Sequence, residues 1–340
     1  MQPFHYSRPA SLAEAIVASG RDQKRNPDVT AAFLAGGTTL VDLMKLNVMQ
    51  PGHVVDLNPS AREFSAIGFD GSVLRLGAFA KMATVADHPD VANHFPVIAQ
   101  SLALAASAQL RNMASLGGNV LQRTRCAYFR DPSWTACNKR TPGSGCAAIG
   151  GANRQHAVLG SSEHCIATYH GDFAQALIAL DAAVTLAGPD GARSMPFASL
   201  HLLPGATPHR ETNLRKGEII TEILVPAGPL ARRSRYVKIR DRQSYEFAVA
   251  SAAVALDMQG DVVNEARIAL GGVATAPWRA LEAEKQLRGN TLNETSATEA
   301  ARAAFAGAVA QSHNGFKIRV GQAAIVRALL ETARMEVRRG

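Results

Sequence analysis

The four cysteines are the residues whose spacing points most directly to chemistry. All of them fall in one stretch of the 340-residue sequence, at Cys126, Cys137, Cys146 and Cys165. They follow the pattern C-x10-C-x8-C-x18-C, in a segment whose glycines and prolines predict a loop. Four thiols this close in sequence can form disulfides, hold a structural zinc ion, bind an iron–sulfur cluster or stay unpaired.

These uses place different demands on the spacing. Disulfides suit small secreted chains, whereas this chain is long enough to bury a substantial core. Structural zinc prefers a C-x2–4-C pair, which the sequence lacks. A four-iron cluster accepts thiolates from well-separated points of a flexible loop. The pattern therefore favours a [4Fe-4S] cluster and leaves the other uses open.

Histidines and basic residues lie beside the cysteines. His156 and His164 are possible ligands, but four thiolates are already present, so we expect both to be hydrogen-bonding or surface residues. A cluster held by four thiolates carries negative charge, and neighbouring cations would ease its reduction. The cations that flank the cysteines are Arg123, Arg125, Lys139 and Arg140.

Two glycine-rich turns are suited to holding phosphate. The first is "LAGGTTL" at residues 34–40, and the second is "NMASLGGN" at residues 112–119. Paired glycines let the backbone approach a ligand closely, and amide and hydroxyl groups can then hold a phosphate at a helix start. One such turn also serves as a plain strand-to-helix connection. Two turns can hold a pyrophosphate from both sides, which favours a dinucleotide ligand.

Helices and strands are expected to alternate around these motifs. Ser11 and Glu14 form a capping box for a helix that should end at Gly20. Asp172 can cap a helix over 173–180, and a strand follows at once. The other elements expected before the C-terminal third are strands at 31–34, 53–58 and 72–80 and a single helix over 96–109.

A second break falls at Pro226, Gly228 and Pro229. Beyond it, we expect strands at 245–256 and 266–274 and a long closing helix over 320–337. The sequence thus predicts an α+β protein with domains at 1–228 and 229–340, the first of which carries a cysteine-bearing insertion at about 122–166.

Composition narrows the class of protein. The net charge is +8 and the isoelectric point is about 9.6, which permits acidic partners without demanding them, and we expect no nucleic-acid binding. The basic run at 232–242 should form a strand that is solvated or faces an anion, with a phosphate or flavin contact as the alternative. No run of about 18 apolar residues appears, so no membrane insertion is expected. The first residues do not resemble a secretory signal.

The two glycine turns, "DFAQALIALDAAV" and "YVKIRDRQSYEFAVASAAVAL" together resemble the FAD-binding subunit of the molybdenum hydroxylases, the family of xanthine and carbon monoxide dehydrogenases. The match spans nearly the whole chain. It implies a two-part FAD-binding lobe of the vanillyl-alcohol-oxidase type and a C-terminal lobe of the carbon monoxide dehydrogenase flavoprotein type. The inserted cysteine segment is similar, more narrowly, to the flavin subunit of bacterial periplasmic aldehyde oxidoreductases, in which four cysteines hold a [4Fe-4S] cluster.

This resemblance implies a set of site residues. The metal ligands would be the four cysteines, and Asp172 and Lys238 would lie near the flavin. Thr39 and Ser115 depart from the family's usual residues, but each keeps a side chain that can form hydrogen bonds. The implied FAD-binding residues are Leu34, Ala35, Gly36, Gly37, Thr38, Thr39, Leu40, Asn112, Ser115, Gly117, Gly118, Asn119, Asp172 and Lys238.

The resemblance also implies a function. The chain would pass electrons through FAD to an external acceptor, in a heterotrimer with a large molybdopterin-binding subunit and a small subunit that carries two [2Fe-2S] clusters. The complex would be periplasmic if a partner carries an export signal, and cytoplasmic otherwise. Two alternatives remain: a self-sufficient flavin dehydrogenase or oxidase, and a structural zinc-binding scaffold.

Overall fold

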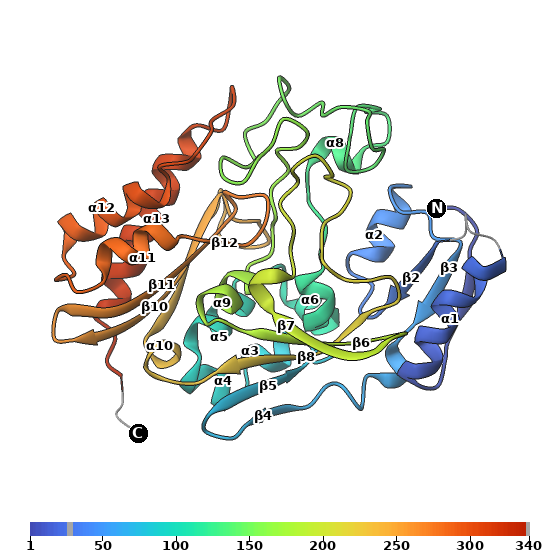
Figure 1. Cartoon of the computed structure of the whole chain (residues 1–340), viewed down its shortest axis with the longest axis horizontal. Helices are drawn as coiled ribbons and strands as arrows, with labels where there is room; N and C mark the ends of the chain where they lie inside the picture. Colours follow the sequence, from blue (N-terminus) through green and yellow to red (C-terminus); the bar gives the residue numbers. More distant parts are fainter. Residues whose placement is uncertain (26–29, 338–340) are drawn as a thin grey trace.

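Three β-sheets lie in a row across the molecule, each with its own helices (Figure 1). The structure is a computed structural model that describes residues 1–25 and 30–337. The sheet built from the N-terminal strands lies at one end of the row, and the sheet built from the C-terminal strands lies at the other. This mixture of helices with one parallel and two antiparallel sheets is the α+β class that the sequence predicts.

The first sheet is parallel, with strands β1 (His5–Ser7), β3 (His53–Asp56) and β2 (Ala31–Leu34) in that order. Helices α1 (Leu12–Arg25) and α2 (Leu40–Lys45) provide the crossovers that parallel strands require. Half of the predicted capping box is present: Ser11 Oγ accepts a hydrogen bond from Glu14 N–H at 3.2 Å, but the Glu14 carboxylate accepts from Ala10 N–H at 3.0 Å instead of from Ser11 N–H. The predicted end at Gly20 is wrong, since the residues that follow are mostly good helix formers and α1 continues through them.

The central sheet has five strands, in the order β4-β5-β8-β6-β7. Every pair of adjacent strands in this sheet is antiparallel. Apolar side chains of the sheet, such as Leu74 and Ile223, are buried in one core with Ile98 and Leu177 from the helices above. The strands are β4 (Ile67–Phe69), β5 (Val73–Gly77), β8 (Ile219–Pro226), β6 (Ala183–Gly188) and β7 (Gly191–Pro196).

Short helices cover the central sheet, and one prediction about them is wrong. The helix expected over 96–109 is interrupted at Ala106, whose φ of +49° is incompatible with an α-helix. Ser107 then caps the next helix, because its Oγ accepts a hydrogen bond from Leu110 N–H at 3.3 Å. The helices are α3 (Met82–Ala86), α4 (Pro89–His94), α5 (Pro96–Ala103), α6 (Ala108–Met113), α7 (Leu116–Val120) and α9 (Phe173–Ala179), with 3-10 turns at Asn58–Ser60 and Phe197–Ser199.

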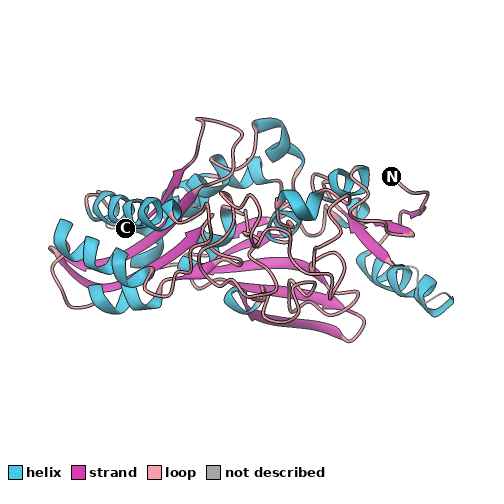
Figure 2. Cartoon of the chain, turned by 90° about the horizontal axis from the view of Figure 1, so that it is seen from above, coloured by secondary structure: helices cyan, strands magenta, loops and turns pink. Residues whose placement is uncertain are grey.

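The cysteine-bearing excursion leaves the central layer after α7 and returns at α9. Within residues 121–172, all of which are described, the single helix is α8 (Ala127–Arg130). The remainder is loop, which rises above the sheets in Figure 1 and lies over the middle of the molecule in Figure 2. The predicted loop character of this segment is therefore confirmed.

The C-terminal sheet is antiparallel, in the order β12-β11-β10-β9, and a second core joins it to its helices. The strand expected from Tyr245 begins instead at Ala250, because Tyr245 adopts a φ of +52° that breaks the extended backbone. No helix in the part of the chain described is long and apolar enough to cross a bilayer. The elements are α10 (Pro229–Arg232), β9 (Ser234–Ile239), β10 (Ala250–Gln259), β11 (Val262–Gly271), β12 (Trp278–Arg279), α11 (Leu281–Leu287), α12 (Glu294–Ala304) and α13 (Phe316–Ala333).

Candidate functional site

Two pockets adjoin at the glycine turns. The interlobe pocket has a volume of about 430 Å³ and is walled by α2, the start of the cysteine excursion and the 242–247 loop of the C-terminal lobe. The strand pocket has a volume of about 350 Å³ and lies against β2 and β8. Thr38, Thr39 and Gly118 line both pockets, so the two predicted turns form the boundary between them.

The first turn, residues 34–40, connects β2 to α2 and leaves its backbone donors free. The N–H groups of residues 36–39 have no acceptor among the described residues. Gly37 adopts a φ of +74°, which directs successive amides along a path that other residues take only with strain. Free, adjacent N–H groups at a helix start form a favourable anion site. The predicted residues Leu34 to Leu40 thus lie in one half-buried turn between the pockets.

The second turn packs directly against the first. A Cβ at Gly36 would collide with the carbonyl of Met113, so only glycine permits this approach. Ser115 is buried and caps α7, since its Oγ accepts a hydrogen bond from Gly118 N–H at 3.2 Å. Its hydroxyl is therefore engaged within the protein.

The remaining residues of the second turn differ in their surroundings. Asn119 lines the interlobe pocket, and its buried Oδ1 has no hydrogen-bond partner in the part of the chain described. Gly117 lines the strand pocket, where Ala78 leaves little room for a larger residue. Asn112 is exposed on α6 and lines neither pocket. Asn119 thus offers an unused acceptor to a ligand.

Asp172 and Lys238 form a buried ion pair between the central and C-terminal lobes. Lys238 Nζ lies 2.9 Å from Asp172 Oδ2 and also donates to the Leu104 carbonyl at 3.0 Å. The Tyr236 hydroxyl donates to Asp172 Oδ1 at 2.6 Å. Burial raises the pKa of Asp172, and Lys238 opposes that rise. Asp172 lines the interlobe pocket, whereas Lys238 does not.

The expected cap by Asp172 is wrong. Asp172 occupies the N-cap position of α9, but its side chain makes no capping hydrogen bond. Both carboxylate oxygens point instead to the side chains of β9. A tertiary partner has replaced the local one, because a buried carboxylate is stabilised far more by a cation than by an amide alone.

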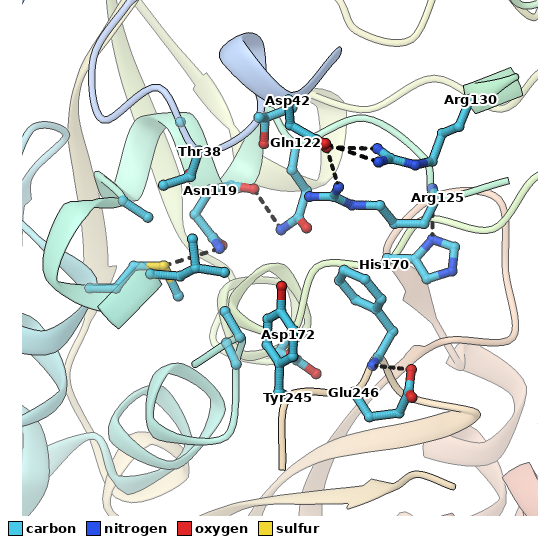
Figure 3. Close-up of a pocket in the computed structure, with 18 of the residues that line it drawn as sticks. Thr38, Asp42, Asn119, Gln122, Arg125, Arg130, His170, Asp172, Tyr245 and Glu246 are labelled. Carbon is cyan, nitrogen blue, oxygen red and sulfur yellow. Dashed lines mark hydrogen bonds and ion pairs between the residues drawn. The ribbon is translucent and has the colours of Figure 1, made fainter. Parts of the chain in front are cut away.

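Sequence reasoning missed a cationic wall of the interlobe pocket. Arg125 and Arg130 share the carboxylate of Asp42, each through a contact of 2.7 Å (Figure 3). The hydrogen bond from Arg130 is the main reason that the pKa of Asp42 is lowered. The three charges leave a net positive charge at this wall. No local pattern in the sequence predicts that α2 lies beside the cysteine excursion, because the two segments are far apart in the chain.

The 242–247 loop, which was expected to be part of a strand, covers another side of the interlobe pocket (Figure 3). Tyr245 is exposed, and Phe247 lies against the Arg125 guanidinium at 5.3 Å from the ring centre. His170 is buried beside Phe247, and burial lowers its pKa to about 3. A neutral ring and two aromatic side chains therefore close the pocket opposite the glycine turns.

All four cysteines line one small cavity of about 10 Å³. Three are buried and Cys146 is partly buried. Burial raises the pKa of Cys126 to about 11, whereas a hydrogen bond with Cys165 lowers the pKa of Cys146 to about 6 and raises that of Cys165. Within residues 1–25 and 30–337, no three His, Cys, Asp or Glu side chains are grouped so that they could hold a metal ion as they stand.

The neighbours of the cysteines have separate roles. His156 Nε2 lies 3.1 Å from Cys126 Sγ, and burial lowers the pKa of His156 to about 4. His164 is exposed. The cations expected to flank the cysteines are anchored elsewhere. Arg123 and Lys139 pair with Glu211, and Arg140 donates to backbone carbonyls of α8.

Consecutive residues of the chain line the cysteine cavity and the interlobe pocket. Arg125 lines the interlobe pocket, and the next residue, Cys126, lines the cysteine cavity. A third cavity of about 230 Å³ touches both residues and includes His156 and His170 in its wall. The cysteine cavity and the interlobe pocket therefore adjoin through Arg125 and Cys126.

Comparisons with known proteins agree with this geometry. Residues 2–228 match the family described as the FAD-binding domain in molybdopterin dehydrogenase, and residues 235–332 match the carbon monoxide dehydrogenase flavoprotein C-terminal domain. The chain is 41% identical to the aldehyde oxidoreductase FAD-binding subunit PaoB of Escherichia coli, over 97% of this chain and 98% of that protein. It is 27% identical to the carbon monoxide dehydrogenase medium chain of Hydrogenophaga pseudoflava, over 89% of this chain and 86% of that protein.

Solved structures show the same fold. A chain of carbon monoxide dehydrogenase from Hydrogenophaga pseudoflava matches with a TM-score of 0.74 and 27% identity, covering 98% of this chain and 97% of that chain. A chain of quinoline 2-oxidoreductase from Pseudomonas putida 86 matches with a TM-score of 0.73 and 25% identity, covering 98% of both chains. The comparisons thus extend over all three sheets.

Proposed function

Because the chain belongs to the family of FAD-binding medium subunits of the molybdenum hydroxylases, we propose that it is the electron-transfer subunit of an aldehyde oxidoreductase and holds both FAD and a [4Fe-4S] cluster. Bound FAD accepts electrons from one redox partner and passes them to another. The chain's own residues bind and orient this group. These residues line the two adjoining pockets and the turn between them.

The two adjoining pockets fit the two halves of FAD. The dinucleotide joins two ring systems through a diphosphate, and the free N–H groups of residues 36–39 lie where the pockets meet. We assign the diphosphate to this turn. The strand pocket, with apolar lining from Phe33, Leu57 and Ile220, suits the adenosine half. The interlobe pocket suits the flavin ring, because the free Asn119 Oδ1 can accept a hydrogen bond from it.

The four cysteines in one cavity are the observation that carries the cluster proposal. Four thiolates are the ligand set of a [4Fe-4S] cluster, and each binds a different iron, so the sulfurs need not converge on one point. The surrounding side chains, such as Phe129 and Ile166, are buried and apolar and would shield the cluster from water. Cys146 and Cys165 lie close enough to shift each other's pKa, and the cavity of about 10 Å³ is smaller than a cluster. Cluster binding requires the contact between these two cysteines to open.

The chain's composition supports the proposed partners. Four cysteines suffice for one cluster and leave none for a pair of [2Fe-2S] clusters. We therefore assign aldehyde oxidation to a large molybdopterin-binding subunit and the two-iron clusters to a small subunit. Electrons would enter this chain from the small subunit and leave to an external acceptor. Membership of the family makes a zinc scaffold unnecessary to explain the cysteines.

Replacement of one cysteine separates the two cofactors. In the complete complex, Cys137→Ser should remove the iron and sulfide that this chain holds and leave most of the FAD, because Cys137 lines the cysteine cavity and neither flavin pocket. Iron, acid-labile sulfide and flavin are measured per complex. Ser133→Ala, an exposed change in the same loop, is the control and should alter neither. Unchanged iron and sulfide in Cys137→Ser would contradict the cluster proposal.

A further inference from the structure

The side chain of His156 contacts the sulfur of Cys126, one of the four predicted cluster ligands. Its Nε2 lies 3.1 Å from Cys126 Sγ, in a buried setting. Among the described residues, the only other polar side-chain interaction of a cysteine sulfur is the one between Cys146 and Cys165. Cys126 is therefore the cysteine with a side-chain partner that could remain after a cluster binds.

The C-terminal lobe holds the backbone of His156 in place. The His156 carbonyl accepts hydrogen bonds from Lys317 Nζ at 3.2 Å and from Asn314 Nδ2 at 3.4 Å. Its backbone N–H donates to the Asn153 carbonyl at 3.0 Å, and Tyr128 lies beside the ring at 6.0 Å between centres. These bonds fix the backbone of His156, and so the point from which its buried ring reaches the sulfur.

Cluster binding would settle which ring nitrogen carries the proton. A neutral imidazole has one N–H, and a free thiol can either donate to the ring or accept from it. A thiolate bound to iron has no proton, so only the form protonated at Nε2 can keep this contact as a hydrogen bond. The other form would leave a buried N–H at Nδ1 without a partner, because Nδ1 has none in the part of the chain described.

We propose that His156 is a positioning residue for the cluster, whose Nε2–H donates a hydrogen bond to Cys126 Sγ and makes the cluster easier to reduce. Reduction adds negative charge to the cluster, and a donor aimed at a ligand sulfur stabilises that charge more in the reduced state. The inference rests on the cluster of the proposed function. It also links the cluster to the C-terminal lobe, since Lys317 and Asn314 fix the backbone of His156 from that side.

Redox titration of matched variants in the complete complex tests this assignment. His156→Leu removes the donor, and His156→Gln keeps an N–H near the position of Nε2. We expect the cluster's midpoint potential, followed by electron paramagnetic resonance, to become more negative in His156→Leu and to recover in part in His156→Gln. His209→Leu, at an exposed histidine that lines neither the cysteine cavity nor the adjoining pockets, should leave the potential unchanged. Equal potentials in all four proteins, each with full iron, would overturn the hydrogen bond while leaving the cluster intact.

A second measurement does not depend on the survival of the leucine variant. When the histidine nitrogens of the wild-type complex are isotope-labelled, pulsed paramagnetic resonance of the reduced cluster should detect a coupled histidine nitrogen. The coupling should vanish in His156→Gln, whose amide is unlabelled. Its absence from the wild-type complex would overturn the proposal. Wild-type complex without this chain's iron would overturn the cluster first and the inference with it, so the two failures are distinguishable.

Discussion

Gly37 decides, through its backbone alone, what the first turn can hold. Its φ of +74° lies in the left-handed region, and a Cβ there would be 3.3 Å from both Leu34 and Val41 side chains. The neighbouring N–H groups, which have no protein acceptor among the described residues, depend on this geometry. The sequence predicts this role from paired glycines after a strand.

Gly37→Val should therefore lose flavin. A β-branched residue at this φ costs about 1–3 kcal/mol of strain, and relief of that strain would move the amides away from the diphosphate. We expect FAD affinity to fall about tenfold or more, which corresponds to about 1.4 kcal/mol. Flavin fluorescence of the released cofactor measures the bound fraction.

Gly260→Val is the matched control for that change. Gly260 also has a positive φ, of +59°, but it lies in the turn between β10 and β11 and lines neither flavin pocket. Its substitution should destabilise the protein by a similar amount and leave FAD affinity near that of the wild type. Equal flavin loss in both variants would mean that strain alone, and not the position of the turn, explains the effect.

The cationic wall of the interlobe pocket could not be predicted from the sequence. Glycines and cysteines carry a signal in their identity, whereas Arg125 and Asp42 are ordinary charged residues until the fold brings them together. Arg125 was expected to act on the cluster because it precedes Cys126. Its guanidinium faces the interlobe pocket instead, since neighbouring residues of an extended segment point in different directions.

Strand β9, helix α9 and the end of α5 meet at the ion pair of Asp172 and Lys238. The two side chains are 4% and 1% exposed, so their charges are compensated almost entirely by each other and by Tyr236 and the Leu104 carbonyl. Removing one partner of a buried pair leaves the other charge without compensation. This pair therefore fixes the C-terminal lobe against the floor of the interlobe pocket.

Asp172→Asn should lower the free energy of unfolding by about 3–5 kcal/mol, because Lys238 remains buried without its carboxylate. Urea denaturation measures this change. Asp172→Asn combined with Lys238→Met should cost less than the sum of the two single changes, since neither charge remains. Glu282→Gln breaks an exposed pair with Lys285 and should cost less than about 1 kcal/mol. Additive costs for the buried pair would show that it is not coupled.

Elements were predictable where one periodic pattern dominated. Strands β2 and β3 of the first sheet and the closing helix α13 follow from apolar periodicity and glycine or proline boundaries, although α13 begins and ends about four residues earlier than expected. Strand β1 was not expected. The break at Ala106 and the loop at Tyr245 were missed, because both depend on positive φ values at residues that carry no glycine-like signal. Both residues line the interlobe pocket, and local propensity tends to fail at functional sites.

At the scale of the whole molecule, the fold brings the pockets at the glycine turns and the cavity lined by the four cysteines into adjoining positions. The row of three sheets places the flavin pockets between the first and last lobes, and the excursion above them carries all four cysteines (Figure 1). The sequence could predict an FAD-binding domain, which the family match supports, whereas the cluster stays a prediction. The sequence could not predict that the interlobe pocket and the cysteine cavity adjoin through Arg125 and Cys126, because this depends on how the excursion folds back over the pockets.

Quantitation of FAD and iron in the anaerobically purified full-length chain tests the central claim most directly. The account predicts one FAD and about four irons with matching acid-labile sulfide per chain, together with the visible absorbance of both groups. Protein that is intact and folded but contains neither iron nor flavin would contradict it.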